Sequence, residues 1–134
     1  MKQSLLLTIT SLLSILLLTF HLADDIVRGF EQGKLSNLTA VPLVVIFLYG
    51  TLMLAERRSG YIIILLFSLL GLVVPLIHMS GRGVGPGSRI AGTSGAFFFV
   101  WTLIAIGVTS LFSIILSLHG LWNLRRKNLA ANTD

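Results

Sequence analysis

Long apolar segments alternate with short polar ones along the 134-residue chain. A transmembrane α-helix needs about 20 apolar residues to cross a hydrocarbon core about 30 Å thick, and four segments have close to that length. None of the four contains Asp, Glu, Lys or Arg. They run from Ser4 to Ala23, from Leu38 to Ala55, from Tyr61 to Met79 and from Ala96 to Trp122. The pattern predicts an all-α integral membrane protein with four transmembrane helices in an up-down-up-down bundle.

The four spans leave no stretch long enough for a separate soluble domain. We therefore expect residues 1–134 to form a single transmembrane domain that ends in a short basic tail at 123–134. Lys2 and the Leu-rich run behind it resemble the start of a secretory signal peptide, but no A-x-A-like cleavage site follows. This favours a retained first helix, with a cleaved signal as the alternative.

The distribution of Lys and Arg predicts the orientation. With four spans, both termini lie on one side of the membrane, and the side richer in Lys and Arg is the cytoplasmic one. The side of the termini holds six of the ten basic residues, and the other side holds four. The six are Lys2, Arg57, Arg58, Arg125, Arg126 and Lys127; the four are Arg28, Lys34, Arg82 and Arg89. We expect a multi-pass protein of the plasma or inner membrane with both termini cytoplasmic.

Composition supports a membrane protein and excludes several functions. Hydrophobic residues make up 54% of the chain and charged residues 11%, whereas soluble domains carry about 25% charged residues. The net charge of +5 is spread over short polar segments, which does not make a nucleic-acid-binding stripe. The chain has no cysteine, which excludes disulfides, thiolate metal ligands and a cysteine nucleophile. Nucleotide-binding loops and the H-E-x-x-H and G-x-S-x-G motifs are also absent.

Small and hydroxyl residues recur on one side of three spans. At 100° per residue each set falls within one sector, and such faces let helices pack closely while Leu, Ile and Phe face lipid. On the first span the sector continues past Ala23 into charged residues, which predicts that this helix extends beyond its apolar part. The three sets are Ser4, Ser11, Ser14, His21, Asp25 and Arg28; Ser68, Gly71, Pro75 and His78; and Thr102, Thr109, Ser110, Ser113 and Ser117.

A polar cluster lies where the first span leaves the membrane. His21 is followed by Asp24 and Asp25, three and four residues later, within reach on one side of a helix. Arg28 stands four residues after Asp24 and three after Asp25. Since the first and third spans run in the same direction, His78 should lie at the same depth as His21, near the outer surface.

Three interpretations compete for this cluster. The first is an ordinary helix end, with the carboxylates paired to Arg28 and the histidines solvated; Arg82 would join that network. In the second, His21, Asp24 or Asp25, and His78 bind a divalent metal such as zinc, iron or copper, which imidazole and carboxylate suit. In the third, the two histidines are axial ligands of a b-type haem.

The Gly-rich stretch 81–89 carries Arg82 and Arg89, which with Arg28 are candidate contacts for an anion or a lipid headgroup. A flexible loop is the simpler explanation of its glycines. His119 is expected near the opposite membrane surface, outside the cluster.

These observations favour a non-enzymatic membrane component that associates with itself or with a larger membrane complex through its small-residue faces. The alternative is a metal- or haem-binding membrane protein with an outer-face site at His21, Asp24, Asp25 and His78. A small oligomeric transporter is disfavoured, because no charge lies inside the spans to couple ions.

Overall fold

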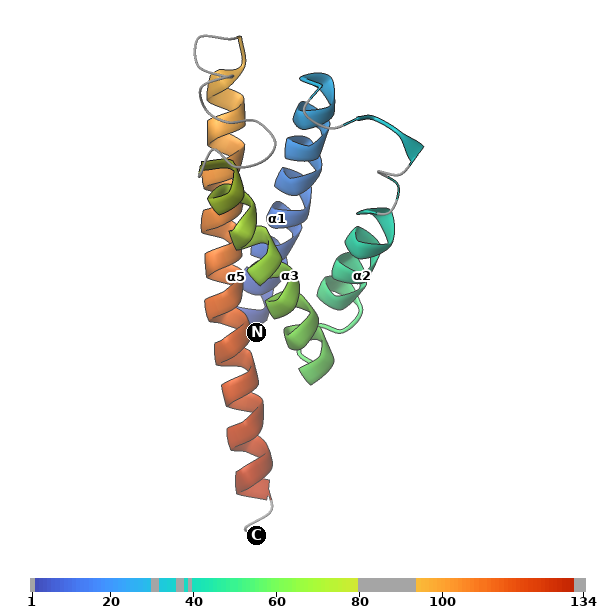
Figure 1. Ribbon diagram of the computed structural model, residues 1–134. Helices are drawn as coiled ribbons and strands as arrows, with labels where there is room; N and C mark the ends of the chain where they lie inside the picture. Colours follow the sequence, from blue (N-terminus) through green and yellow to red (C-terminus); the bar gives the residue numbers. More distant parts are fainter. Residues whose placement is uncertain (1, 30–31, 36–37, 39, 80–93, 132–134) are drawn as a thin grey trace.

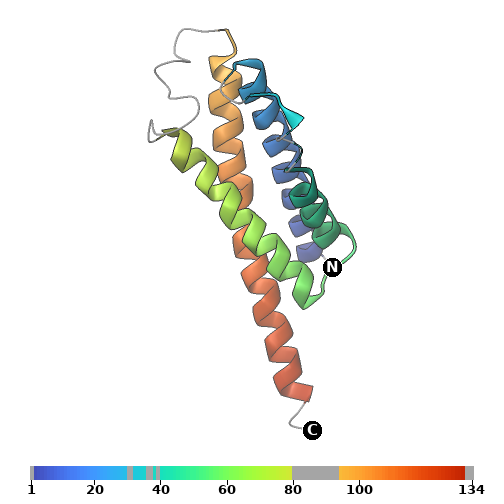
Figure 2. The ribbon, with the colours of Figure 1, turned by 45° about the vertical axis from the view of Figure 1, so that its right-hand side comes forward.

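The computed structural model describes residues 2–29, 32–35, 38, 40–79 and 94–131. Within this part the protein is all-helical, with four helices: α1 (Lys2–Val27), α2 (Ala40–Leu52), α3 (Arg58–Met79) and α5 (Ala96–Ala131). Successive helices run in opposite directions, so α1 and α3 point one way and α2 and α5 the other (Figures 1 and 2). Arg82 and Arg89 lie outside the described residues.

Three helices are long and apolar enough to cross a membrane: Ser4–Val27 in α1, Arg58–His78 in α3, and α5. As predicted, α1 continues past Ala23. The segment 38–55, however, forms a helix of only 13 residues, about 20 Å long at 1.5 Å per residue. After Leu52 the chain instead turns. In this turn Glu56 adopts a left-handed conformation (φ 64°), and the Arg57 amide donates to the Leu54 carbonyl.

The last helix is longer than its apolar segment. α5 has 36 residues and does not stop at Trp122, so most of the predicted tail is helical. Residues 123–131 contain no Gly or Pro, and their Leu, Arg, Lys and Ala are good helix formers. As a result, the last turns of α5 reach beyond the turn between α2 and α3 (Figure 1).

α5 is the helix around which the others assemble. It packs against both α1 and α3, whereas α2 lies against α3 and α1. The predicted hydroxyl faces are turned inward: the Ser14 hydroxyl donates to Thr109 Oγ1 (2.9 Å), and the Ser113 hydroxyl donates to Thr10 Oγ1 (3.0 Å). Leu, Ile, Val and Phe side chains cover the outside. Hydroxyl side chains inside the bundle and apolar side chains on its surface suit a protein surrounded by lipid.

Candidate metal site

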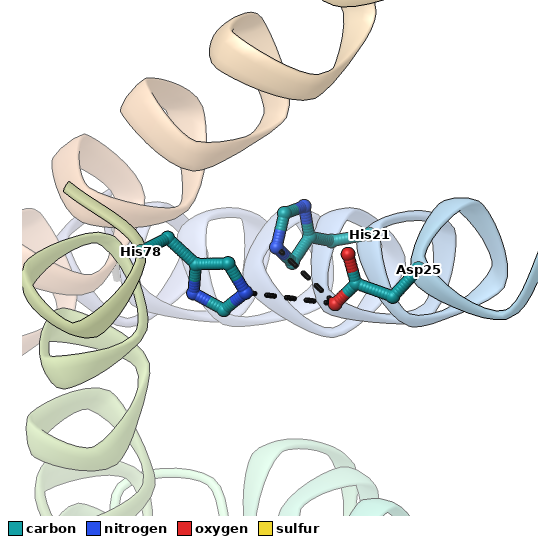
Figure 3. A group of neighbouring side chains, drawn as sticks. All are labelled: His21, Asp25 and His78. Atoms are coloured by element: carbon teal, nitrogen blue, oxygen red, sulfur yellow. Dashed lines mark ion pairs between the residues drawn. The ribbon is translucent and has the colours of Figure 1, made fainter. Parts of the chain in front are cut away.

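Three helices meet where α1 and α3 end and α5 begins. α1 carries His21 and Asp25, one turn apart, and the last turn of α3 carries His78. Figure 3 shows both imidazoles directed at the same carboxylate oxygen of Asp25. The first two turns of α5 supply Phe99 and Thr102, which close the group from the third side.

The three side chains lie at distances that suit a shared ion. Asp25 Oδ2 is 3.7 Å from His21 Nε2 and 3.6 Å from His78 Nε2, and one ligand atom from each residue lies within 4.8 Å of the other two. These separations are too long for strong hydrogen bonds. Two donors each about 2.0–2.1 Å from one metal ion are roughly 3.3 Å apart at a tetrahedral angle. Each nitrogen is therefore close to the required distance from the carboxylate oxygen, whereas the most distant pair of ligand atoms would have to approach by up to about 1.5 Å to share one ion.

Hydrogen bonds fix which nitrogen of each histidine is available. His78 Nδ1 lies 2.8 Å from the Val74 carbonyl oxygen, which only accepts, so Nδ1 carries the hydrogen. The Thr102 hydroxyl donates to the Phe99 carbonyl (2.9 Å), so its oxygen accepts from His21 Nδ1 (3.1 Å). Neither Nε2 atom has a hydrogen-bond partner among the described residues. Metal-ligating histidines are typically held in this way, with the second nitrogen bonded to a carbonyl or other acceptor.

The site is buried. His21 is 3% exposed and Asp25 5%, and the side chain of His78 is 10% exposed. The Phe99 ring packs against both imidazoles, with ring centroids 4.9 and 5.8 Å away. A bound cation would place a positive charge beside this carboxylate and would engage both Nε2 atoms.

Asp24 does not join this group. Its carboxylate accepts a 2.6 Å hydrogen bond from Arg28 Nε, as the helix-end interpretation predicts, whereas His21, which that interpretation expects to be solvated, is buried. The guanidinium reaches on to the start of α5, where Nη2 lies 3.5 Å from the Ser94 carbonyl. A side chain at Gly95 would collide with it, since a Cβ there would be 2.6 Å from Nη2. Arg28 thus pairs with Asp24 and ties α1 to α5 beside the histidines.

The ring geometry argues against haem. The imidazoles of His21 and His78 meet edge to face, with centroids 4.8 Å apart and planes inclined by 75°. Two axial ligands stand on opposite faces of a macrocycle, which would have to lie between them. His119 is exposed and lies toward the far end of α5, away from the cluster as expected.

Two residues of the site were not singled out in the sequence. Thr102 was assigned only to the packing face of its helix, and Phe99 was not considered. Both lie within two turns of the start of α5, at the same end as His21 and His78, and this shared depth is the signal that could have found them. No known protein family, curated protein or solved structure matches the chain.

Proposed function

We propose that the protein is an integral membrane four-helix protein that binds one divalent transition-metal ion near the outer membrane surface, through His21 Nε2, His78 Nε2 and the Asp25 carboxylate. The observation that carries the proposal is the pair of Nε2 atoms, which share one carboxylate oxygen while both Nδ1 atoms are engaged elsewhere. This arrangement requires His78 of α3 to lie at the same depth in the bundle as His21 and Asp25 of α1.

The donor set indicates the class of metal. Imidazole nitrogen suits zinc, iron, copper and nickel, whereas magnesium and calcium prefer oxygen ligands. The set contains no sulfur, so selection of copper(I) by thiolate or thioether is not expected from these three residues. Three protein ligands leave at least one coordination position for water or another small molecule, as in catalytic zinc sites.

The packing of the helices argues against the competing hypothesis, a non-enzymatic membrane component that associates with itself or a larger complex through its small-residue faces. Association through small-residue faces requires those faces to be available to a partner. Here Ser11, Ser68 and Ser110 are at most 1% exposed, because α1, α3 and α5 bury these faces against one another. A partner helix would meet the Leu- and Phe-rich outer surface instead.

Metal content of the purified protein tests the proposal. After stripping with a chelator, reloading with zinc and dialysis, we expect about one ion per chain, as a single three-ligand site requires. His21→Ala, His78→Ala and Asp25→Asn each remove a ligand and should lower zinc affinity by ~10-fold or more. The measurement is metal per chain by mass spectrometry, together with a competitive chelator titration.

Two substitutions provide matched controls. Asp24→Asn makes the same chemical change one residue away, in a carboxylate paired with Arg28, and His119→Ala removes a histidine outside the site. Both variants should bind zinc as the native chain does. A native chain without metal after reloading, or equal metal in Asp24→Asn and Asp25→Asn, would rule the site out. Helical content and elution volume verify that each variant is folded.

A further inference from the structure

The opposite end of the molecule has a second feature, unrelated to the histidines. A pocket of about 790 Å³ opens between the start of α3 and the last turns of α5. It exists because α5 is longer than its neighbours and continues past the turn between α2 and α3 (Figure 1). The ring of Tyr61 lies against Gly120, where a Cβ atom would overlap it, and so holds α3 close to α5 beside the pocket.

The lining of the pocket is amphipathic. Ile62, Leu121 and Leu124 form an apolar wall. Arg57 from the turn before α3, Arg58 from the start of α3 and Arg125 from α5 line the same space. Arg125 lies far from the other two in the sequence, and only the fold brings it to them.

The charge of the pocket favours an anion. Three guanidinium groups line it against one acid, Glu56. Guanidinium binds phosphate through paired hydrogen bonds, which makes arginine the preferred residue for phosphate recognition. α3 begins at Arg58, so the positive end of its helix dipole also lies at this pocket.

Its position favours a lipid over a soluble anion. The pocket lies where α5 passes from Leu121 and the half-exposed Trp122 into polar sequence, and tryptophan marks the headgroup level of membrane helices. Basic pockets between transmembrane helices are known to hold anionic headgroups. We propose that this pocket binds an anionic phospholipid, with its phosphate at Arg57, Arg58 and Arg125 and an acyl chain along Ile62, Leu121 and Leu124. The proposal does not depend on the metal site.

Native mass spectrometry of the full-length protein in detergent tests this proposal. With phosphatidylglycerol and phosphatidylcholine offered in equal amounts, the native chain should retain phosphatidylglycerol preferentially. Arg58→Gln/Arg125→Gln removes one guanidinium from each side of the pocket and should weaken retention by ~10-fold, since charge-assisted hydrogen bonds are lost. Arg126→Gln/Lys127→Gln removes the same charge from residues outside the lining and should leave retention unchanged.

Three results would overturn the proposal: equal retention of the two lipids, equal loss in the two double variants, or displacement of the lipid by glycerol phosphate at the same concentration. Displacement by glycerol phosphate would show that the pocket binds the phosphate alone and that the apolar wall does not contribute to binding. If the first double variant does not elute as a folded protein, the single substitution Arg125→Gln takes its place, because Arg125 is an exposed residue whose loss leaves the helix contacts intact.

Discussion

Thr102 determines which nitrogen of His21 faces the other ligands. Its hydroxyl donates to the Phe99 carbonyl and accepts from His21 Nδ1, which leaves Nε2 for the ion. Thr102→Val preserves the shape of the side chain and removes the acceptor. We expect zinc affinity to fall by ~10–100-fold, the usual effect of losing such a partner of a metal-bound histidine. A competitive chelator titration measures the change.

The same helix offers controls for this substitution. Thr102→Ser keeps the hydroxyl and should restore most of the affinity. Thr109 lies two turns after Thr102, and its hydroxyl accepts a hydrogen bond from Ser14. Thr109→Val removes this hydroxyl and should alter stability without altering zinc affinity. If Thr102→Val binds zinc like the native chain, the hydrogen bond to His21 has no role in metal binding.

At the level of single residues, the sequence pointed to the residues of the cluster, but it did not predict which acid would face the histidines and which would pair with Arg28. Asp24 and Asp25 both lie within reach of His21, and both lie within reach of Arg28. Which acid turns to the histidines depends on where α3 and α5 stand around α1, and helix periodicity along one segment carries no such information. The structure assigns Asp25 to the histidines and Asp24 to Arg28.

Between elements, Tyr61 of α3 packs directly against Gly120 in the C-terminal half of α5. A Cβ atom at Gly120 would overlap the ring, and Tyr61 is only 9% exposed, so the ring cannot move aside freely. Gly120→Ala should destabilise the fold by about 1–3 kcal/mol, the usual cost of overpacking. Thermal unfolding in detergent measures this effect.

His119→Ala is the matched comparison, because it introduces the same side chain at the neighbouring, exposed position. It should unfold at nearly the native temperature. Equal unfolding temperatures for Gly120→Ala and the native chain would show that α3 and α5 are not closely packed at this level.

The helices themselves were predicted well, but two of their ends were not. Apolar length alone placed a span at 38–55, yet the chain reverses after Leu52 and forms its turn from residues that are still apolar. Hydropathy also ended the last span at Trp122, although the polar residues that follow continue the helix to Ala131. In both cases a local property, turn geometry or helix propensity, overrode the hydrophobic pattern.

Across the whole molecule, the two proposed sites lie at opposite ends of the bundle. The metal ligands belong to the ends of α1 and α3, whereas the arginine-lined pocket belongs to the start of α3 and the end of α5. If the arginines face the cytoplasm, as the distribution of basic residues predicts, the histidines face the outer surface. Metal would then reach its site from outside, and the lipid would come from the inner leaflet.

Single cysteines test this orientation cleanly, because the native chain contains none. Gln32→Cys places a thiol in the exposed segment after α1, and Ala131→Cys places one at the exposed end of α5. In right-side-out vesicles, a membrane-impermeant maleimide should label Gln32→Cys directly and Ala131→Cys only after the vesicles are opened. The reverse pattern would place the histidines on the cytoplasmic side. Labelling of both thiols in sealed vesicles would mean that an even number of helices crosses the membrane between them, as would happen if the 13-residue α2 did not span it.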